Sequence, residues 1–294
     1  MKRNDTDKTT KIINSEPKHK KLSDADKKKK KIVLVCICIL IIAIIAGVLA
    51  GVFIIKKKNA EKKAVPTQSK LTYTLADNRQ KLAEFKTKNN DAVAWLEIPD
   101  SNVNDPVVQA KDNDFYLRKT ELKKYNVYGC YFADYECSVG PGASSLSENT
   151  IIYGHSNTRE NPNGKKFEQL FKYRDIEFLK KNPIIFLSLQ NENVAFEVFA
   201  VFYTTTDFYY ITTTPLTDDF DDFTKQIYEK NEYVFNGGKI TKNDKILTLS
   251  TCAFRYDKGK TGNHRFVVMG RMLKKGENPK STEITRNPNP KRPE

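Results

Sequence analysis

Few side chains beyond residue 55 could supply a nucleophile together with an acid or a base. That part of the chain holds three cysteines (Cys130, Cys137 and Cys252) and two histidines (His155 and His264). A cysteine nucleophile needs a base or cation that favours its thiolate, and a donor that stabilises the oxyanion formed on the substrate. Cys252 and His155 each stand where an apolar, strand-like run, LTLST or IIYG, gives way to a loop. These positions make Cys252 a candidate nucleophile and His155 a candidate partner for it.

Arg265 opens a third such run, RFVVM, and three strand ends can meet at one rim of a barrel. A guanidinium there would stabilise an oxyanion. Each residue alone also has a plainer explanation, because a lone cysteine is more often a buried small hydrophobe than a nucleophile. One lone cysteine and two histidines give no paired spacing such as CxxC or HxxxH, so we expect neither a metal site nor a cofactor.

The elements that would position these residues are mainly strands. Eight short β-rich runs recur between turn signals, and helical patterns are confined to the connections. This arrangement is typical of a closed or nearly closed β-barrel rather than a sheet of βαβ units. The runs span residues 94–98, 107–109, 128–132, 150–153, 184–189, 194–203, 245–249 and 266–269.

Three segments show helical spacing. Residues 69–88 predict an amphipathic helix before the first strand. Residues 165–181 predict one or two short helices with Asp175 as a cap, and residues 218–229 predict a helix before the Cys252 strand. The apolar face of the first segment consists of Leu71, Leu75, Leu82 and Phe85.

The charge is concentrated at the two ends of the chain. The whole sequence has a net charge of +14, but residues 64–273 carry 27 Lys/Arg and 27 Asp/Glu. A nucleic-acid-binding domain would need its own basic face. The neutral central part therefore gives no support for a nucleic-acid partner.

Residues 32–55 form an apolar run of 24 residues without a charge, long enough to cross a bilayer. A cleaved signal peptide would be shorter and would end in a small-residue site, whereas three lysines follow this run. Twelve Lys/Arg precede the run and five follow it closely, which predicts a cytoplasmic N-terminus and an extracellular domain. We expect a disordered basic tail (1–31), a transmembrane signal-anchor (32–55), a linker (56–68), a catalytic domain (69–273) and a disordered tail (274–294).

The order of three motifs resembles the sortases, transpeptidases of the Gram-positive cell surface with an eight-stranded β-barrel. These motifs are TLSTC ending at Cys252, YGH ending at His155, and the Arg265 strand thirteen residues after the cysteine. TLSTC is similar to the class B form. The helix before the first strand, the helix at 218–229 and the segments AWLEIPDSNVNDPVVQ and DNDFYL also resemble class B. Ala253 departs from the pattern, since several class B members carry an acidic residue there.

The resemblance implies a reaction and a role for each residue. Cys252 would attack the Thr carbonyl of a C-terminal, NPxTN-like sorting motif of a surface protein and form a thioester. His155 would protonate the leaving amine and deprotonate the incoming one, while Arg265 stabilises the oxyanion or holds the substrate. The acceptor would be an amine of cell-wall precursor (lipid II). The residues that resemble substrate contacts are Asn113, Leu117, Tyr153, Thr206, Tyr210, Ile211 and Ser250.

Other functions stay open at this point. A pilin-polymerising sortase would use the same chemistry with a pilin lysine as acceptor. A cysteine hydrolase or L,D-transpeptidase also uses Cys, His and Arg, although its Cys and His usually lie closer together than the 97 residues here. A non-catalytic binding module is a third class. A Cys130–Cys137 disulfide also stays open, although three cysteines after the apolar run are too few for a disulfide framework.

Overall fold

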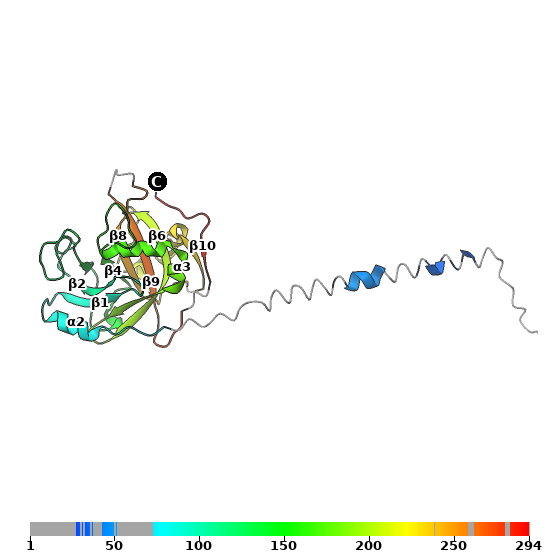
Figure 1. Ribbon diagram of the computed structural model, residues 1–294. Coiled ribbons are helices and arrows are strands. Elements are labelled where there is room, and N and C mark those ends of the chain that lie inside the picture. Colours follow the sequence, from blue (N-terminus) through cyan, green and yellow to red (C-terminus); the bar gives the residue numbers. More distant parts are fainter. Residues whose placement is uncertain are drawn as a thin grey trace, which may run out of the picture. The chain divides into compact units, whose positions relative to one another are not determined.

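The computed structural model describes residues 73–237, 239–257, 262–279 and 283–293, with scattered residues between 28 and 51 (Figure 1). The chain divides into two units, Met1–Thr67 and Gln68–Glu294. Most of the predicted basic tail, the whole predicted linker and much of the predicted signal-anchor lie outside the described residues. Among the residues that are described, no helix is both long and apolar enough to cross a membrane.

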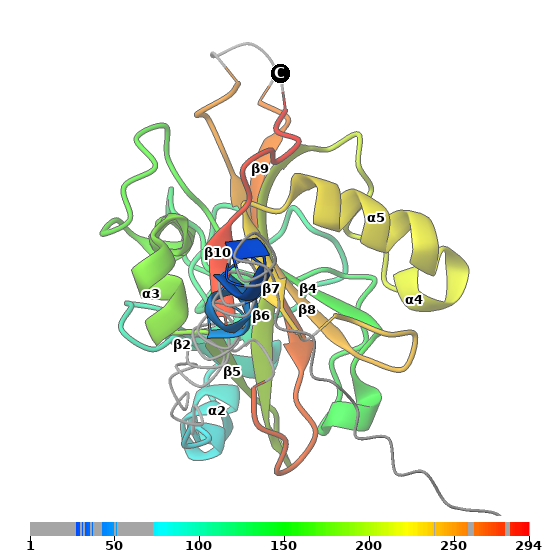
Figure 2. The same cartoon turned by 90° about the vertical axis from the view of Figure 1, so that its right-hand side faces the viewer.

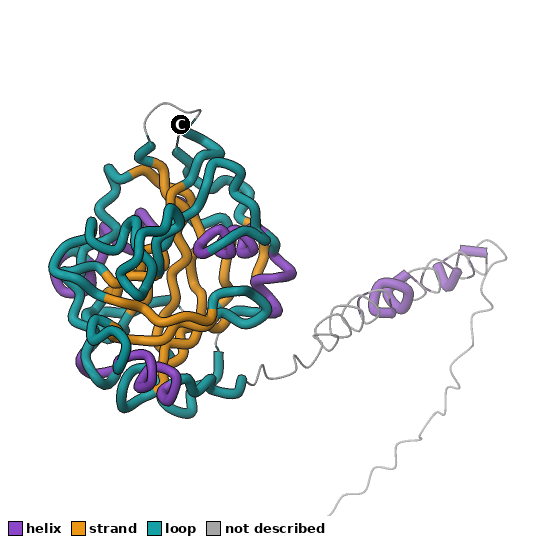
Figure 3. The backbone as a smooth tube through the Cα atoms, turned by 60° about the vertical axis from the view of Figure 1, so that its left-hand side comes forward, coloured by secondary structure: helices purple, strands orange, loops and turns teal. Residues whose placement is uncertain are grey.

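The second unit is built on a closed barrel of eight strands in the order β1-β2-β3-β4-β8-β9-β6-β5. Each predicted run lies on one of these strands, so the barrel is confirmed. Figure 3 shows the strands at the centre with helices and loops around them. Neighbours are antiparallel except for the pairs β2–β3 and β4–β8. The strands are β1 (Ala92–Glu97), β2 (Asn104–Val108), β3 (Tyr131–Ala133), β4 (Asn149–Tyr153), β5 (Ile184–Ser188), β6 (Asn193–Thr205), β8 (Ile246–Cys252) and β9 (His264–Met272).

Strands β6, β8 and β9 are buried on both faces, which explains why they read as continuous apolar runs. One face points into the barrel. The other face of β6 and β9 is covered by α5 (Phe220–Lys230), whose Phe223 and Ile227 pack beside Phe199 and Val267. Figure 2 shows α5, with α4 (Pro215–Asp218), on one side of the barrel and α3 (Ile176–Lys181) on the other. The 3₁₀ helix η2 (Lys166–Arg174) precedes α3, and a short one, η1 (Ala143–Ser145), precedes β4.

The helix predictions hold with one correction. Asp175 caps α3 by accepting a hydrogen bond from the Glu177 N–H, as expected. The helix predicted at 69–88 is wrong for residues 73–78, because α2 spans only Arg79–Lys86, and residues 69–72 lie outside the described part. Residues 73–78 are not helical, and the Asn78 N–H donates to Ser188 Oγ at 3.0 Å. Tyr73 and Ala76 of this segment pack against residues of β5 and β6, whereas Leu75, on the predicted apolar face, is 41% exposed. Tertiary packing thus overrides the helical spacing.

The tail after residue 273 also differs from the expectation of disorder. Residues Glu283–Arg286 form β10, which pairs with β7 (Tyr233–Asn236) in a separate two-stranded sheet. Ile284 is buried, and it is the apolar side chain that fastens the strand. Arg292 continues the attachment with two hydrogen bonds to the Glu232 carboxylate, at 2.7 and 2.6 Å. The sequence pattern missed both strands because each is four residues long.

Cys130 and Cys137 are free, buried thiols, so the bridge between them is not formed. Burial raises the pKa of each thiol to about 12. Cys137 Sγ accepts a hydrogen bond from the Ile151 N–H at 3.2 Å. Both residues belong to the core.

Candidate active site

Strand register brings the three predicted catalytic residues to one place. In the parallel pair of β4 and β8, Tyr153 lies opposite Ser250, so His155 and Cys252 stand two residues further on at the same level. In the antiparallel pair of β8 and β9, Cys252 lies directly opposite Arg265. Paired residues point to the same face of a sheet, and neighbouring strands are about 4.8 Å apart. The three side chains therefore emerge together at one rim.

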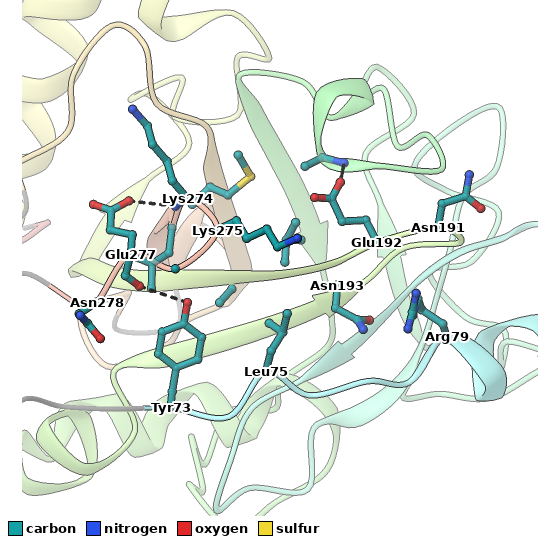
Figure 4. A pocket seen from close by; sticks show the side chains of 16 residues that line it. Tyr73, Leu75, Arg79, Asn191, Glu192, Asn193, Lys274, Lys275, Glu277 and Asn278 are labelled. Carbon is teal, nitrogen blue, oxygen red and sulfur yellow. Dashed lines mark hydrogen bonds between the residues drawn. The ribbon is translucent and has the colours of Figure 1, made fainter.

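A pocket of about 280 Å³ opens at this rim and is lined by all three residues. A larger hollow of about 550 Å³ lies at the other end of β6 and β9, around Tyr73, Lys274 and Glu277 (Figure 4). From Arg265 to Met272 the strand β9 extends about 23 Å, and no cysteine or histidine lines the second hollow. Of these two cavities, only the smaller one is lined by a cysteine and a histidine.

The state of His155 is set by a loop that lies between β2 and β3. Its Nε2 is 2.5 Å from the carbonyl oxygen of Leu117, and a carbonyl can only accept, so Nε2 carries the proton. Nδ1 is then the ring nitrogen free to act as a base. Desolvation lowers the pKa of His155, the Leu117 carbonyl partly offsets this, and nearby Arg118 lowers it further. The imidazole is therefore neutral at physiological pH.

The backbone after Cys252 has no N–H left for an oxyanion. The Ala253 N–H donates to the carbonyl of His264 at 3.0 Å. The next two N–H groups, of Phe254 and Arg255, donate to Glu160. The Arg265 guanidinium is held by Nη1, which donates to the carbonyls of Gly262 and His264 at 2.9 Å each. Its remaining N–H groups are the cationic donors beside the pocket.

Comparisons with known proteins show the family to which the chain belongs. A family model described as the sortase domain matches residues 96–273. Sortase B of Listeria monocytogenes is 36% identical over 219 residues, covering 73% of this chain and 83% of that protein. The chain belongs to the sortase family, class B. Sortase B of Staphylococcus aureus is 29% identical over 201 residues, covering 67% of this chain and 76% of that protein.

The sortase also resembles solved structures in its fold. The structure described as the Staphylococcus aureus sortase B–substrate complex is similar with a TM-score of 0.57 and 28% identity. The match covers 67% of this chain and 86% of that one.

All seven predicted substrate residues of this sortase line the pocket, but they differ in what they offer. Leu117 and Thr206 are exposed, and Asn113, Tyr153 and Ile211 are half-buried. Tyr210 and Ser250 are buried and hydrogen-bonded to each other at 2.8 Å, so they form the floor. Their roles toward a substrate stay predictions.

Asp134 holds two residues that line the pocket, Tyr153 and Asn113, and sequence reasoning missed it. Its buried carboxylate accepts from Tyr153 Oη at 2.7 Å and from Asn113 Nδ2 at 2.9 Å. Burial and the adjacent carboxylate raise the pKa of the Tyr153 phenol, which therefore stays a neutral donor. An aspartate at the end of a three-residue strand gave no signal of this contact. Asp114, Phe132, Gly154 and Thr251 complete the lining.

Proposed function

We propose that this sortase cleaves a C-terminal, NPxTN-like sorting motif after Thr and transfers the protein to an amine of cell-wall precursor. The observation that carries the proposal is the register that sets Cys252 opposite Arg265 and level with His155, at a pocket. The similar solved structure described as a sortase B–substrate complex supports a substrate-binding role for this chain.

Acylation involves two proton transfers, one from the Cys252 thiol to His155 and one from His155 to the leaving amine. His155 Nδ1 takes the thiol proton of Cys252 as sulfur attacks the Thr carbonyl carbon. Arg265 stabilises the negative oxygen of the tetrahedral intermediate. When the intermediate collapses, the C–N bond breaks and the imidazolium gives its proton to the leaving amine. A thioester and a neutral imidazole remain.

Transfer reverses these steps with a new amine. The incoming amine attacks the thioester carbon and His155 takes its proton. The C–S bond then breaks, and the imidazolium returns a proton to the Cys252 sulfur. The amine belongs to the peptide of a cell-wall precursor, and the proposal therefore includes a catalytic unit outside the cell. The apolar run 32–55 and the basic residues before it support a single-pass anchor with a cytoplasmic N-terminus.

Fluorogenic peptides carrying NPxTN, with the x position varied, test the proposal on the full chain in detergent. We expect cleavage between Thr and Asn, and its complete loss in Cys252→Ala. Arg265→Gln should reduce kcat by about 10²–10³-fold, as removal of an oxyanion donor does. Arg255→Gln is the matched control, since it removes another arginine near the nucleophile. Arg255 is exposed and does not line the pocket, so its replacement should leave kcat nearly unchanged.

Mass spectrometry of the products identifies the acceptor. Transfer to an added peptide amine supports the proposal, whereas release of the free acid alone would indicate a hydrolase. Isopeptide bonds between surface subunits would instead identify a pilin polymerase. Cleavage that survives Cys252→Ala would contradict the mechanism.

A further inference from the structure

The segments that follow β4 and β8 stay joined after the strand ladder has ended. Gly154 N–H donates to the carbonyl of Ser250 at 3.3 Å, and Thr251 Oγ1 donates to the carbonyl of Gly154 at 2.7 Å. Ser156 Oγ then donates to the carbonyl of Cys252 itself at 2.5 Å. These bonds extend the pairing past the two predicted catalytic residues.

Glu160 makes the last and most charged of these connections. It lies in the loop after His155, and its carboxylate Oε1 accepts from the backbone N–H groups of Phe254 and Arg255 at 2.7 and 2.9 Å. Both N–H groups follow Cys252 within three residues. A carboxylate that accepts two N–H groups forms stronger bonds than a neutral acceptor would. The loop after His155 is thus hydrogen-bonded to the backbone that follows Cys252.

The second oxygen of Glu160 is held just as firmly. Oε2 accepts from Arg174 Nη1 at 3.0 Å and from Tyr203 Oη at 3.1 Å, and Arg174 Nη2 donates to the Glu160 carbonyl at 2.8 Å. The residue is 5% exposed. Its φ of 47° lies in the left-handed region that a non-glycine residue adopts only when its surroundings determine the conformation. The contacts therefore fix the side chain and the backbone of Glu160 together.

We propose that Glu160 is a positioning residue, which holds the loop after Cys252 against the loop after His155 and so keeps thiol and imidazole in reacting geometry. The proposal rests on the proposed function for its catalytic meaning. Its physical reason is that β4 and β8 end at the site, so ladder hydrogen bonds no longer set the distance between the two side chains. A misplacement of about 1 Å can reduce turnover by about 10²-fold.

Glu168, on η2 just after this loop, offers a matched control. It is also a buried carboxylate that accepts two backbone N–H groups, those of Asn161 and Lys165 at 3.3 and 3.1 Å. These contacts close the loop on η2 and do not reach the segment after Cys252. Glu160→Gln and Glu168→Gln therefore remove comparable charges, and only the first affects the connection between the two loops.

The main measurement is the rate at which Cys252 in the full chain reacts with a methanethiosulfonate reagent, as a function of pH. Labelling is followed by peptide mapping in wild type, Glu160→Gln, Glu160→Ala and Glu168→Gln. We expect the labelling rate near neutral pH to fall in the order Glu, Gln, Ala at position 160. Gln should be intermediate because it keeps one acceptor oxygen, and Glu160→Ala should react about tenfold or more slowly than wild type. Glu168→Gln should match wild type.

A double-mutant cycle separates positioning from loss of stability. In a His155→Ala background, Glu160→Ala should cause no further fall in the labelling rate, because there is no imidazole left to position. An equal fall in both backgrounds, or a fall in Glu168→Gln of the same size, would overturn the proposal. In peptide cleavage, Glu160→Gln should lower kcat with KM unchanged. Labelling needs no sorting peptide, so failure of the wild type to cleave would refute the proposed function and leave this test in force.

Discussion

The pKa of His155 decides the pH range in which the site can begin its reaction. In the proposed mechanism the neutral ring of His155 is the base. Desolvation, with the positive charge of Arg118, lowers the pKa of His155 below the ordinary 6.5 in spite of the bond to Leu117. A lowered pKa keeps the base form populated at more acidic pH. The loop that carries Leu117 and Arg118 thus tunes a residue on another strand.

The acid limb of kcat/KM should therefore lie below pH 6.5, with activity falling as pH falls through it. Arg118→Gln removes a positive charge and should move this limb to higher pH. Lys119→Gln is the control, because Lys119 lies over the Phe115 ring and is not among the causes of the shift. NMR titration of the His155 ring should show the same direction. An unchanged limb in Arg118→Gln would contradict this electrostatic account.

At the scale of elements, helix α5 matters as a cover for the outer face of β6 and β9. Phe223 and Ile227 are buried there, while the opposite side of the helix is exposed. Arg265 is the second residue of β9 and pairs with Cys252, whereas Met269 of the same strand packs in the cluster that contains the buried side of α5. The helix therefore stabilises the strand that supplies the guanidinium, without lining the pocket.

Phe223→Ala should lower the free energy of unfolding by about 3–5 kcal/mol, as is usual for loss of a buried aromatic ring. Lys225→Ala, on the exposed side of the same helix, should stay within about 0.5 kcal/mol. Denaturant unfolding measures both. KM for the sorting peptide should be unchanged in folded Phe223→Ala, and a raised KM would mean that α5 also shapes the pocket.

At the scale of the whole molecule, the catalytic unit separates one usable thiol from two inert ones. Cys252 is half-buried beside the pocket, whereas Cys130 and Cys137 are buried with pKa values of about 12. Only the thiolate reacts with thiol reagents. The barrel thus protects two of its three cysteines by burial.

A charged methanethiosulfonate reagent should label Cys252 at least about a thousandfold faster than Cys130 or Cys137, because those two require opening of the core. Peptide mapping by mass spectrometry gives the three rates. In denaturant, labelling of Cys130 and Cys137 should rise together at the global unfolding transition. Early labelling of either one would show a local opening of its strand.

Sequence reasoning reached the barrel and the catalytic rim because both depend on local patterns. Apolar runs marked the strands, and TLSTC and YGH ended where β8 and the residues after β4 reach the pocket. The structure then gathered the predicted groove residues around the same opening. Their distance along the chain made no difference, since each occupied a motif that could be read locally.

What the sequence could not show are contacts between distant residues without a pattern. Glu160 meets Phe254 across 94 positions, and Asp134 meets Asn113 across 21. Strands β7 and β10 were missed because each is short and becomes regular only by pairing with the other. Residues 73–78 of the predicted helix at 69–88 are not helical for the same reason, since Tyr73 and Ala76 pack against residues of β5 and β6.

The parallel pairing of β4 with β8 also has a consequence for how the enzyme comes into being. His155 is synthesised 97 residues before Cys252, and a parallel pair forms only after the whole intervening chain has closed a large loop. A nascent or partly folded chain therefore has a thiol without its partner imidazole. In the proposed mechanism Cys252 can therefore react only once the barrel is complete, so folding itself delays the chemistry until the molecule is whole.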